Sequence, residues 1–156
     1  MTRFLPRLLM ALLLLPPFSP PVEPRQTGGA TPGTLVVMRG RVVCLDGSGN
    51  RAAEPFGCDK QAPRFALVDK DARLHAFDPA ESSTAVFTDD RVRARDLQVT
   101  ARLNSNKQLE LIKVQSVRDA RLYDIYYFCE ICNIRAYAPG PCPCCRNELE
   151  FRETPP

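Results

Sequence analysis

Five of the seven cysteines in this 156-residue chain lie between positions 129 and 145, close enough in sequence to share one site. They include two C-x-x-C pairs, Cys129–Cys132 and Cys142–Cys145, with nine residues between the pairs. Two such turns on facing loops supply the four thiolates with which zinc forms tetrahedral structural sites. A closed four-thiolate site has no open position for water, so this spacing predicts a structural zinc ion rather than a hydrolytic one.

Cys144 is a fifth thiol in the same segment, and it leaves the ligand set open. It could replace Cys142 or Cys145 as a ligand, stay free, or favour a soft ion such as Cu(I). Iron is a further alternative to zinc for a four-thiolate site. Two disulfides or a redox dithiol are the other interpretation, although the adjacent Cys144 and Cys145 do not pair easily and a C-x-x-C disulfide is strained.

The second cysteine pair reads CPCCR and resembles the C-P-x-C-G knuckle of zinc ribbons and rubredoxins, with Arg146 where glycine is usual. The resemblance covers only the last thirty or so residues. So small a unit cannot fold on apolar burial alone, and a structural zinc ion contributes on the order of 10 kcal/mol of folding free energy. The ligands that the resemblance implies are Cys129, Cys132, Cys142 and Cys145.

Cys44 and Cys58 stand apart from this cluster and bracket a long loop that contains Gly, Asn and Pro. In an oxidising compartment we expect them to form a disulfide, which for a loop of this length contributes about 3 kcal/mol. The alternative is two unrelated buried thiols.

From residue 34 onward, alternating and β-branched segments predict the strands that have to position these cysteines. Gly40 marks a bend or bulge in the first strand, and Asp78-Pro79 has the pattern of a helix start. Five strands with a helix between the third and fourth resemble an OB-fold, a small Greek-key barrel, although other small antiparallel barrels or sandwiches share the pattern. The chain is thus predicted to be mainly β, with an OB-like antiparallel barrel at 34–118 followed by a zinc ribbon at 119–156. Strands are expected at 34–45, 64–69, 73–77, 91–103, 109–117, 122–128 and 147–152, and a short helix at 78–84.

Arg91, Arg93 and Arg95 alternate along one predicted strand and so are expected to share a face. OB-like barrels bind single-stranded nucleic acid or oligosaccharide on such a face, with aromatic rings for stacking. Neighbouring aspartates fit a solvated strand face equally well, so a face for an anionic partner and a simple solvated face both stay open. The candidate stacking rings are Phe65, Phe77 and Phe87.

The sequence offers little for catalysis, and we expect the protein not to be an enzyme. His75 is the only histidine, and no nucleophile elbow or phosphate-binding glycine loop is present. We expect aromatic residues at the start of the ribbon to pack where barrel and ribbon meet. These are Tyr123, Tyr126 and Tyr127.

The N-terminus has the pattern of a targeting segment. Arg3 and Arg7 precede the uncharged apolar run Leu8–Leu15, which is too short to span a bilayer and is typical of an export signal. Because no clear cleavage site follows, residues 1–18 are interpreted as a signal peptide or as an uncleaved membrane tether. Residues 19–33, rich in Pro and Gly, are interpreted as a linker.

Together these features predict a secreted or periplasmic protein that binds zinc for structure and serves as a binding or scaffold module. Its partner would be a protein or a glycan, and nucleic acid is disfavoured because the net charge is only +3 and exported proteins meet little of it. Three alternatives remain: a copper- or zinc-handling protein, a thiol redox protein, and a nucleic-acid-binding protein if the chain is not exported.

Overall fold

The computed structural model describes residues 31–53, 58–59 and 61–156. The predicted signal or anchor at 1–18 and most of the linker at 19–33 lie outside the described residues. In the part of the chain that is described, no helix is long and apolar enough to cross a membrane.

β1 (Leu35–Leu45) is the middle strand of the barrel, and it changes its antiparallel partner along its length. Its first half pairs with β4 (Leu97–Leu103) and its second half with β2 (Arg64–Asp69). The change falls at Gly40, where a Cβ atom would lie 2.0 Å from the carbonyl oxygen of Val68. Only glycine permits this approach, so Gly40 lets β1 bend from one partner to the other.

The remaining barrel strands are β3 (Leu74–Ala76), which pairs with β2, and β5 (Leu109–Arg118), which pairs with β4. This gives the strand order β3-β2-β1-β4-β5. Between β3 and β5 there is no ladder, but a single parallel bridge joins Phe77 to Leu109, and the Asp78 N–H donates to the Leu109 carbonyl at 3.0 Å. The sheet is an open barrel, which confirms the prediction of a mainly β, barrel-like fold.

A 3-10 helix, η1 (Ser82–Thr88), follows β3 and packs Val86 and Phe87 into the barrel core. The helix predicted at 78–84 is therefore placed too early. The Asp78 carboxylate accepts the N–H of Ala80 at 2.9 Å, which makes a turn, and the helix starts only after Glu81.

The strand predicted at 91–103 begins only at Leu97, because a second short helix, α1 (Asp90–Arg93), precedes it. Asp89 caps α1 by accepting the Arg91 N–H at 2.8 Å. The prediction of a strand face formed by Arg91, Arg93 and Arg95 is therefore wrong: the alternation belongs to a helical turn.

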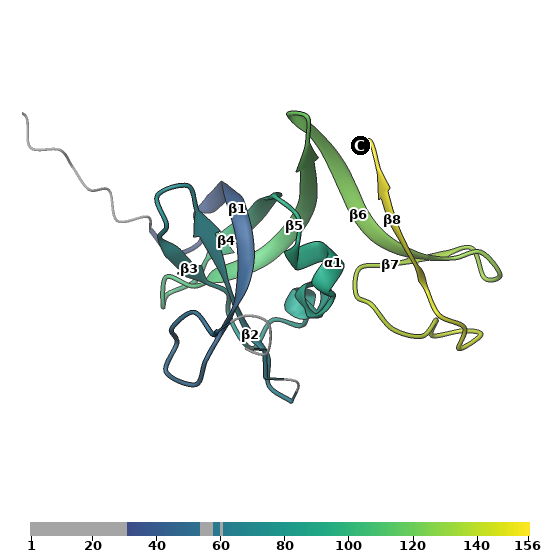
Figure 1. Cartoon of the computed structure of the whole chain (residues 1–156), viewed down its shortest axis with the longest axis horizontal. Coiled ribbons are helices and arrows are strands. Elements are labelled where there is room, and N and C mark those ends of the chain that lie inside the picture. The colour runs from purple at the N-terminus through teal and green to yellow at the C-terminus, as the bar shows by residue number, and fades with distance from the viewer. Residues whose placement is uncertain (1–30, 54–57, 60) are drawn as a thin grey trace, which may run out of the picture.

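The ribbon continues the sheet of the barrel. β6 (Arg121–Cys129) returns from β5 through a hairpin whose turn residues, Asp119 and Ala120, both have positive φ. β6 then pairs with β7 (Ile134–Ala136), which the sequence did not predict, and with β8 (Glu150–Thr154), which starts three residues later than expected (Figure 1). The predicted boundary at 118/119 falls in the β5–β6 turn.

One hydrophobic core joins barrel and ribbon, with Ile125 and Tyr127 of β6 packed into the same cluster as the barrel residues. Phe65, Phe77 and Phe87 lie within it at 3%, 3% and 0% exposure. Rings buried in this way cannot stack on a ligand, so these three phenylalanines are excluded as candidate stacking rings.

Cys44 and Cys58 meet at the edge of this core. Their Cα atoms are 5.1 Å apart, within the range that a disulfide requires. The predicted pairing is confirmed as a pair at disulfide distance, and it ties the loop after β1 back to the barrel.

Candidate metal centre

The first cysteine knuckle grows directly out of β6, whose last residue is Cys129. Cys132 closes the turn, and Asn133 then takes a left-handed backbone conformation with φ 55°, which returns the chain into β7. Asparagine tolerates this conformation better than most residues. The strand pairing of β6 and β7 thus fixes both sides of the knuckle.

The second knuckle has the same backbone ending, at Arg146 with φ 65°. Its N–H donates to the Cys142 carbonyl at 3.0 Å, and the Cys142 N–H donates to the Asn147 carbonyl at 2.7 Å. Arg146 therefore lies in the left-handed backbone region, which glycine adopts without a steric penalty. The departure from glycine keeps the turn and costs about 1 kcal/mol in backbone strain.

The sulfur atoms of Cys129, Cys132, Cys142 and Cys145 all lie within 4.8 Å of one another. A ZnS₄ tetrahedron with bonds of about 2.3 Å has edges of about 3.8 Å, so a small contraction would place all four at bonding distance. The Cys129 and Cys145 sulfurs are 3.5 Å apart, well beyond the disulfide bond length of about 2.05 Å. This donor set fits a four-coordinate soft or borderline metal such as zinc.

The thiols of the group are electrostatically unequal. Backbone N–H groups of Cys145 and then of Cys144 point at the Cys142 sulfur and lower the pKa of Cys142 to about 6. The pKa of Cys132 is raised, chiefly because the Cys144 thiol and then the Cys145 thiol share its proton. A metal ion bound here would displace these protons, so its affinity has to fall on acidification.

Cys144 lies outside the four-sulfur group and is exposed, whereas Cys129 and Cys142 are 3% and 0% exposed. Two buried and two half-buried sulfurs describe a site closed on the protein side. The four residues expected from the sequence are thus brought together, and the fifth thiol remains beside them.

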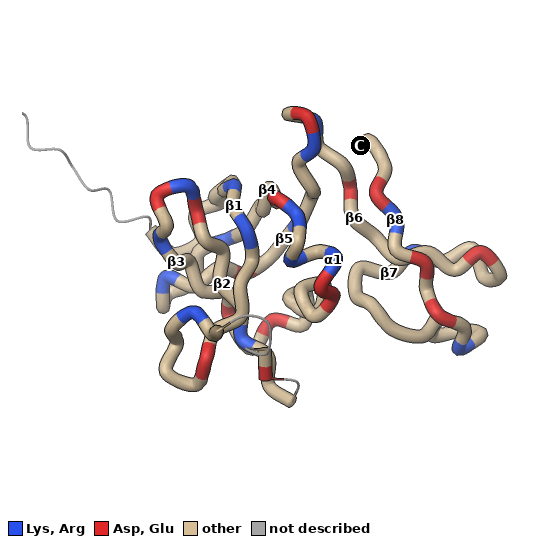
Figure 2. Tube along the Cα trace, in the orientation of Figure 1, with Lys and Arg blue, Asp and Glu red and all other residues tan. Residues whose placement is uncertain are grey.

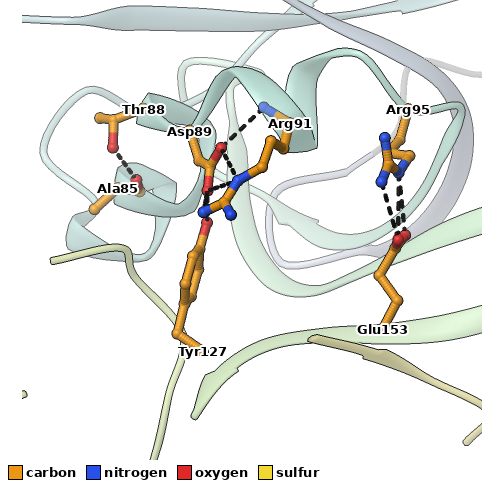
Figure 3. A network of polar contacts seen from close by, with 7 residues as sticks. All are labelled: Ala85, Thr88, Asp89, Arg91, Arg95, Tyr127 and Glu153. Carbon is orange, nitrogen blue, oxygen red and sulfur yellow. Dashed lines mark hydrogen bonds and ion pairs between the residues drawn. The ribbon is translucent and has the colours of Figure 1, made fainter. Parts of the chain in front are cut away.

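On the barrel side, the ribbon is held by a polar network centred on Asp89 (Figure 3). The hydroxyl of the buried Tyr127 donates to the Asp89 carboxylate at 2.8 Å, and Arg91 donates to the same carboxylate at 2.7 Å. Burial and the neighbouring carboxylate raise the pKa of Tyr127, so the phenol stays protonated and donates. The prediction that Tyr127 packs where barrel meets ribbon is confirmed.

A second contact joins Arg95 to Glu153 of β8 at 3.1 Å (Figure 3). The guanidinium groups of Arg91 and Arg95 also lie 4.8 Å and 5.9 Å from the centre of the Phe151 ring. Two of the three arginines that were candidates for a partner-binding face therefore contact the ribbon. The third, Arg93, donates to the Phe87 carbonyl at 2.6 Å and pairs with Asp90.

The other singled-out residues lie away from the metal centre. The His75 ring nitrogen Nε2 lies 2.8 Å from Asp69, which lowers the pKa of that carboxyl group. Tyr126 lies under Arg135 on the opposite ribbon face, and Tyr123 lies under Arg118 in the β5–β6 hairpin. The absence of catalysis stays a prediction.

Comparison with known proteins gives no match: no family model, no curated protein and no solved structure is significantly similar to the chain. The four-cysteine group is compatible with a zinc-knuckle module on its geometry alone.

Proposed function

We propose that the protein is an exported, non-catalytic binding or scaffold module in which one zinc ion folds the ribbon. The observation that carries the proposal is the convergence of four cysteine sulfurs at the end of β6, a strand whose inner face packs into the barrel core. A metal at that position holds β6, both knuckles and β7 together. The zinc site would thus have a structural role and not a catalytic one.

The role of a rigid scaffold is supported by the way in which the ribbon meets the barrel. The junction combines apolar packing of Tyr127 and Phe151 with ion pairs from Arg91 and Arg95. Asp89 and Glu153 are each only 8% exposed in their side chains, whereas Arg91 and Arg95 are 57% and 35% exposed, so solvent screens these pairs in part. A ribbon docked in this way presents one fixed surface with the barrel.

Export is supported by the apolar run near the N-terminus and by the pair formed by Cys44 and Cys58. Disulfides persist in oxidising compartments and are rare in the cytosol, so a Cys pair at bonding distance fits an exported chain.

The test is metal removal from protein purified out of its native compartment. Removal of the metal with a strong chelator should abolish the dispersed NMR amide signals of the ribbon, since folding of the ribbon depends on the ion. Adding zinc back should restore these signals. The zinc-loaded protein should not reduce insulin disulfides, because a zinc-bound thiolate is a poor redox catalyst. A ribbon that stays folded without metal, or steady insulin reduction by the loaded form, would overturn the proposal.

A second function, the handling of a soft metal, is favoured by one observation. Cys144 is exposed and directly precedes the half-buried Cys145, so its thiol could displace a ligand and start metal exchange. Release of zinc to a competing chelator separates the two functions. A structural site releases zinc slowly in both wild type and Cys144→Ser, whereas a carrier releases it quickly and slows markedly when Cys144 is removed.

A further inference from the structure

A cleft opens on the barrel where β1 changes partner at Gly40. It has a volume of about 730 Å³, and it lies between α1 with the start of β4 on one side and the end of β2 with its turn on the other. The volume is that of a site for a ligand of several residues and exceeds what a single small anion needs. The metal centre is not part of it.

The rim of the cleft is mainly cationic, and Figure 2 shows basic positions along β1. Its three acidic side chains are already engaged: Asp96 with Arg41 at 2.8 Å, Asp90 with Arg93, and Asp69 with His75. The five cations that line it are Arg39, Arg41, Arg51, Lys70 and Arg93.

Two of these cations are available to a ligand. Arg39 is exposed and donates to the neutral side-chain oxygen of Gln98 at 2.9 Å, which leaves its charge uncompensated. Lys70 is exposed at the β2–β3 turn and forms no ion pair with any described residue. A third, Arg41, is in a pair exposed by 64% and 65%, which an incoming carboxylate can replace at little cost.

The floor is aliphatic, and no aromatic ring lines the cleft among the described residues. Sequence-independent binding of single-stranded nucleic acid depends on aromatic rings for base stacking, and the cleft does not provide such rings. An aliphatic floor inside a cationic rim is complementary to a peptide that carries apolar and acidic side chains. The floor residues are Val43, Val68 and Val117, whereas Val42 and Leu97, which also line the cleft, belong to the barrel core at 3% and 0% exposure.

We propose that this cleft binds an acidic peptide segment of a partner protein, with an apolar side chain on the floor and carboxylates at Arg39 and Lys70. The inference rests on the proposed function as a binding module and gives that module a partner class. Guanidinium groups such as that of Arg39 bind carboxylates in a two-pronged geometry, which favours carboxylate over a neutral chain.

The experiment uses the full zinc-loaded chain and a fluorescent peptide in which Glu and Leu alternate, with a Gln-Leu peptide as the neutral probe. The double variant Arg39→Gln/Lys70→Gln should bind the acidic peptide about tenfold more weakly and with a flatter salt dependence. The matched control is Arg102→Gln/Arg121→Gln, which removes the same charge at exposed positions outside the cleft and should bind like wild type.

Equal binding of the acidic and neutral peptides, or an equal loss in the control variant, would overturn the proposal. So would tighter binding of single-stranded oligothymidylate or of a sulfated oligosaccharide to the same cleft, shown by the same loss in the cleft variant. Zinc content and melting temperature, measured on each variant, keep this test separate from the metal test: the cleft can fail while the zinc-folded module stands.

Discussion

Removal of one hydroxyl group at the junction of barrel and ribbon should destabilise the protein measurably. Tyr127→Phe deletes the donor that lies 2.8 Å from the Asp89 carboxylate and leaves the buried ring in place. A hydrogen bond to a charged group contributes about 1.5–3 kcal/mol. Because Arg91 still donates to Asp89 through its backbone and its guanidinium, we expect the lower part of that range, about 1.5–2 kcal/mol.

The assay is denaturant or thermal unfolding of the zinc-loaded protein, in which this loss corresponds to about 4–6 °C in melting temperature. Tyr123→Phe is the matched control on the same strand, because no hydrogen bond joins the Tyr123 hydroxyl to a described residue and its ring keeps Arg118 at 3.9 Å. The control should change stability by less than about 0.5 kcal/mol. If both variants have the same unfolding free energy, or if Tyr127→Phe is less stable because it has lost its zinc, the Tyr127 hydroxyl does not hold the ribbon against the barrel.

Three further changes test other parts of the structure. Gly40→Ala should lower the unfolding free energy by at least about 2–3 kcal/mol, since its Cβ would lie 2.0 Å from a carbonyl oxygen. Gly47→Ala, with open space around it, should be near neutral. Similar losses in the two variants would contradict the close approach of β1 and β2 at Gly40. Arg146→Gly should raise the unfolding free energy by up to about 1 kcal/mol by relieving the left-handed strain, and a clear loss would show that the arginine has another role. Burial raises the pKa values of Asp89 and Glu153, but hydrogen bonds from their arginines lower these pKa values by more, so the net shift is downward. Both carboxylates therefore stabilise the fold above their unfolded pKa near 4, and this contribution is lost as the pH falls through the lower folded pKa. Acid should therefore destabilise wild type more than Glu153→Gln in denaturant titrations, and an equal acid effect on both would count against the ion pair.

The sequence was sufficient to group the four candidate metal-ligating cysteines, because their spacing is local. A C-x-x-C turn fixes two sulfurs within four residues, and only the meeting of Cys129 and Cys142 required the fold. The left-handed residue after each knuckle was less predictable, since Arg146 carries no sign of the conformation it adopts. The barrel strands were found because period-two alternation is strong wherever one face is buried.

The segment 91–95 shows how alternation can mislead. Arginine at every second position fits a strand, but Asp89 caps a helix there, and the buried Val92 anchors it to the core. The pattern T-D-D at 88–90 was the available sign of a helix start. That Arg91 and Arg95 face the ribbon depends on long-range contacts with Phe151 and Glu153, which no local pattern contains.

Elemental analysis of three proteins tests whether the sulfurs of Cys129, Cys132, Cys142 and Cys145 hold one zinc ion. Wild type and Cys144→Ser should each contain close to one zinc per chain after mild purification, because Cys144 lies outside the four-sulfur group. Cys132→Ser should lose most of its zinc, since it removes a ligand of the tetrahedron. Metal-free wild type with Cys129, Cys132, Cys142 and Cys145 in two disulfides, or zinc lost from Cys144→Ser and retained by Cys132→Ser, would contradict this assignment of the ligands.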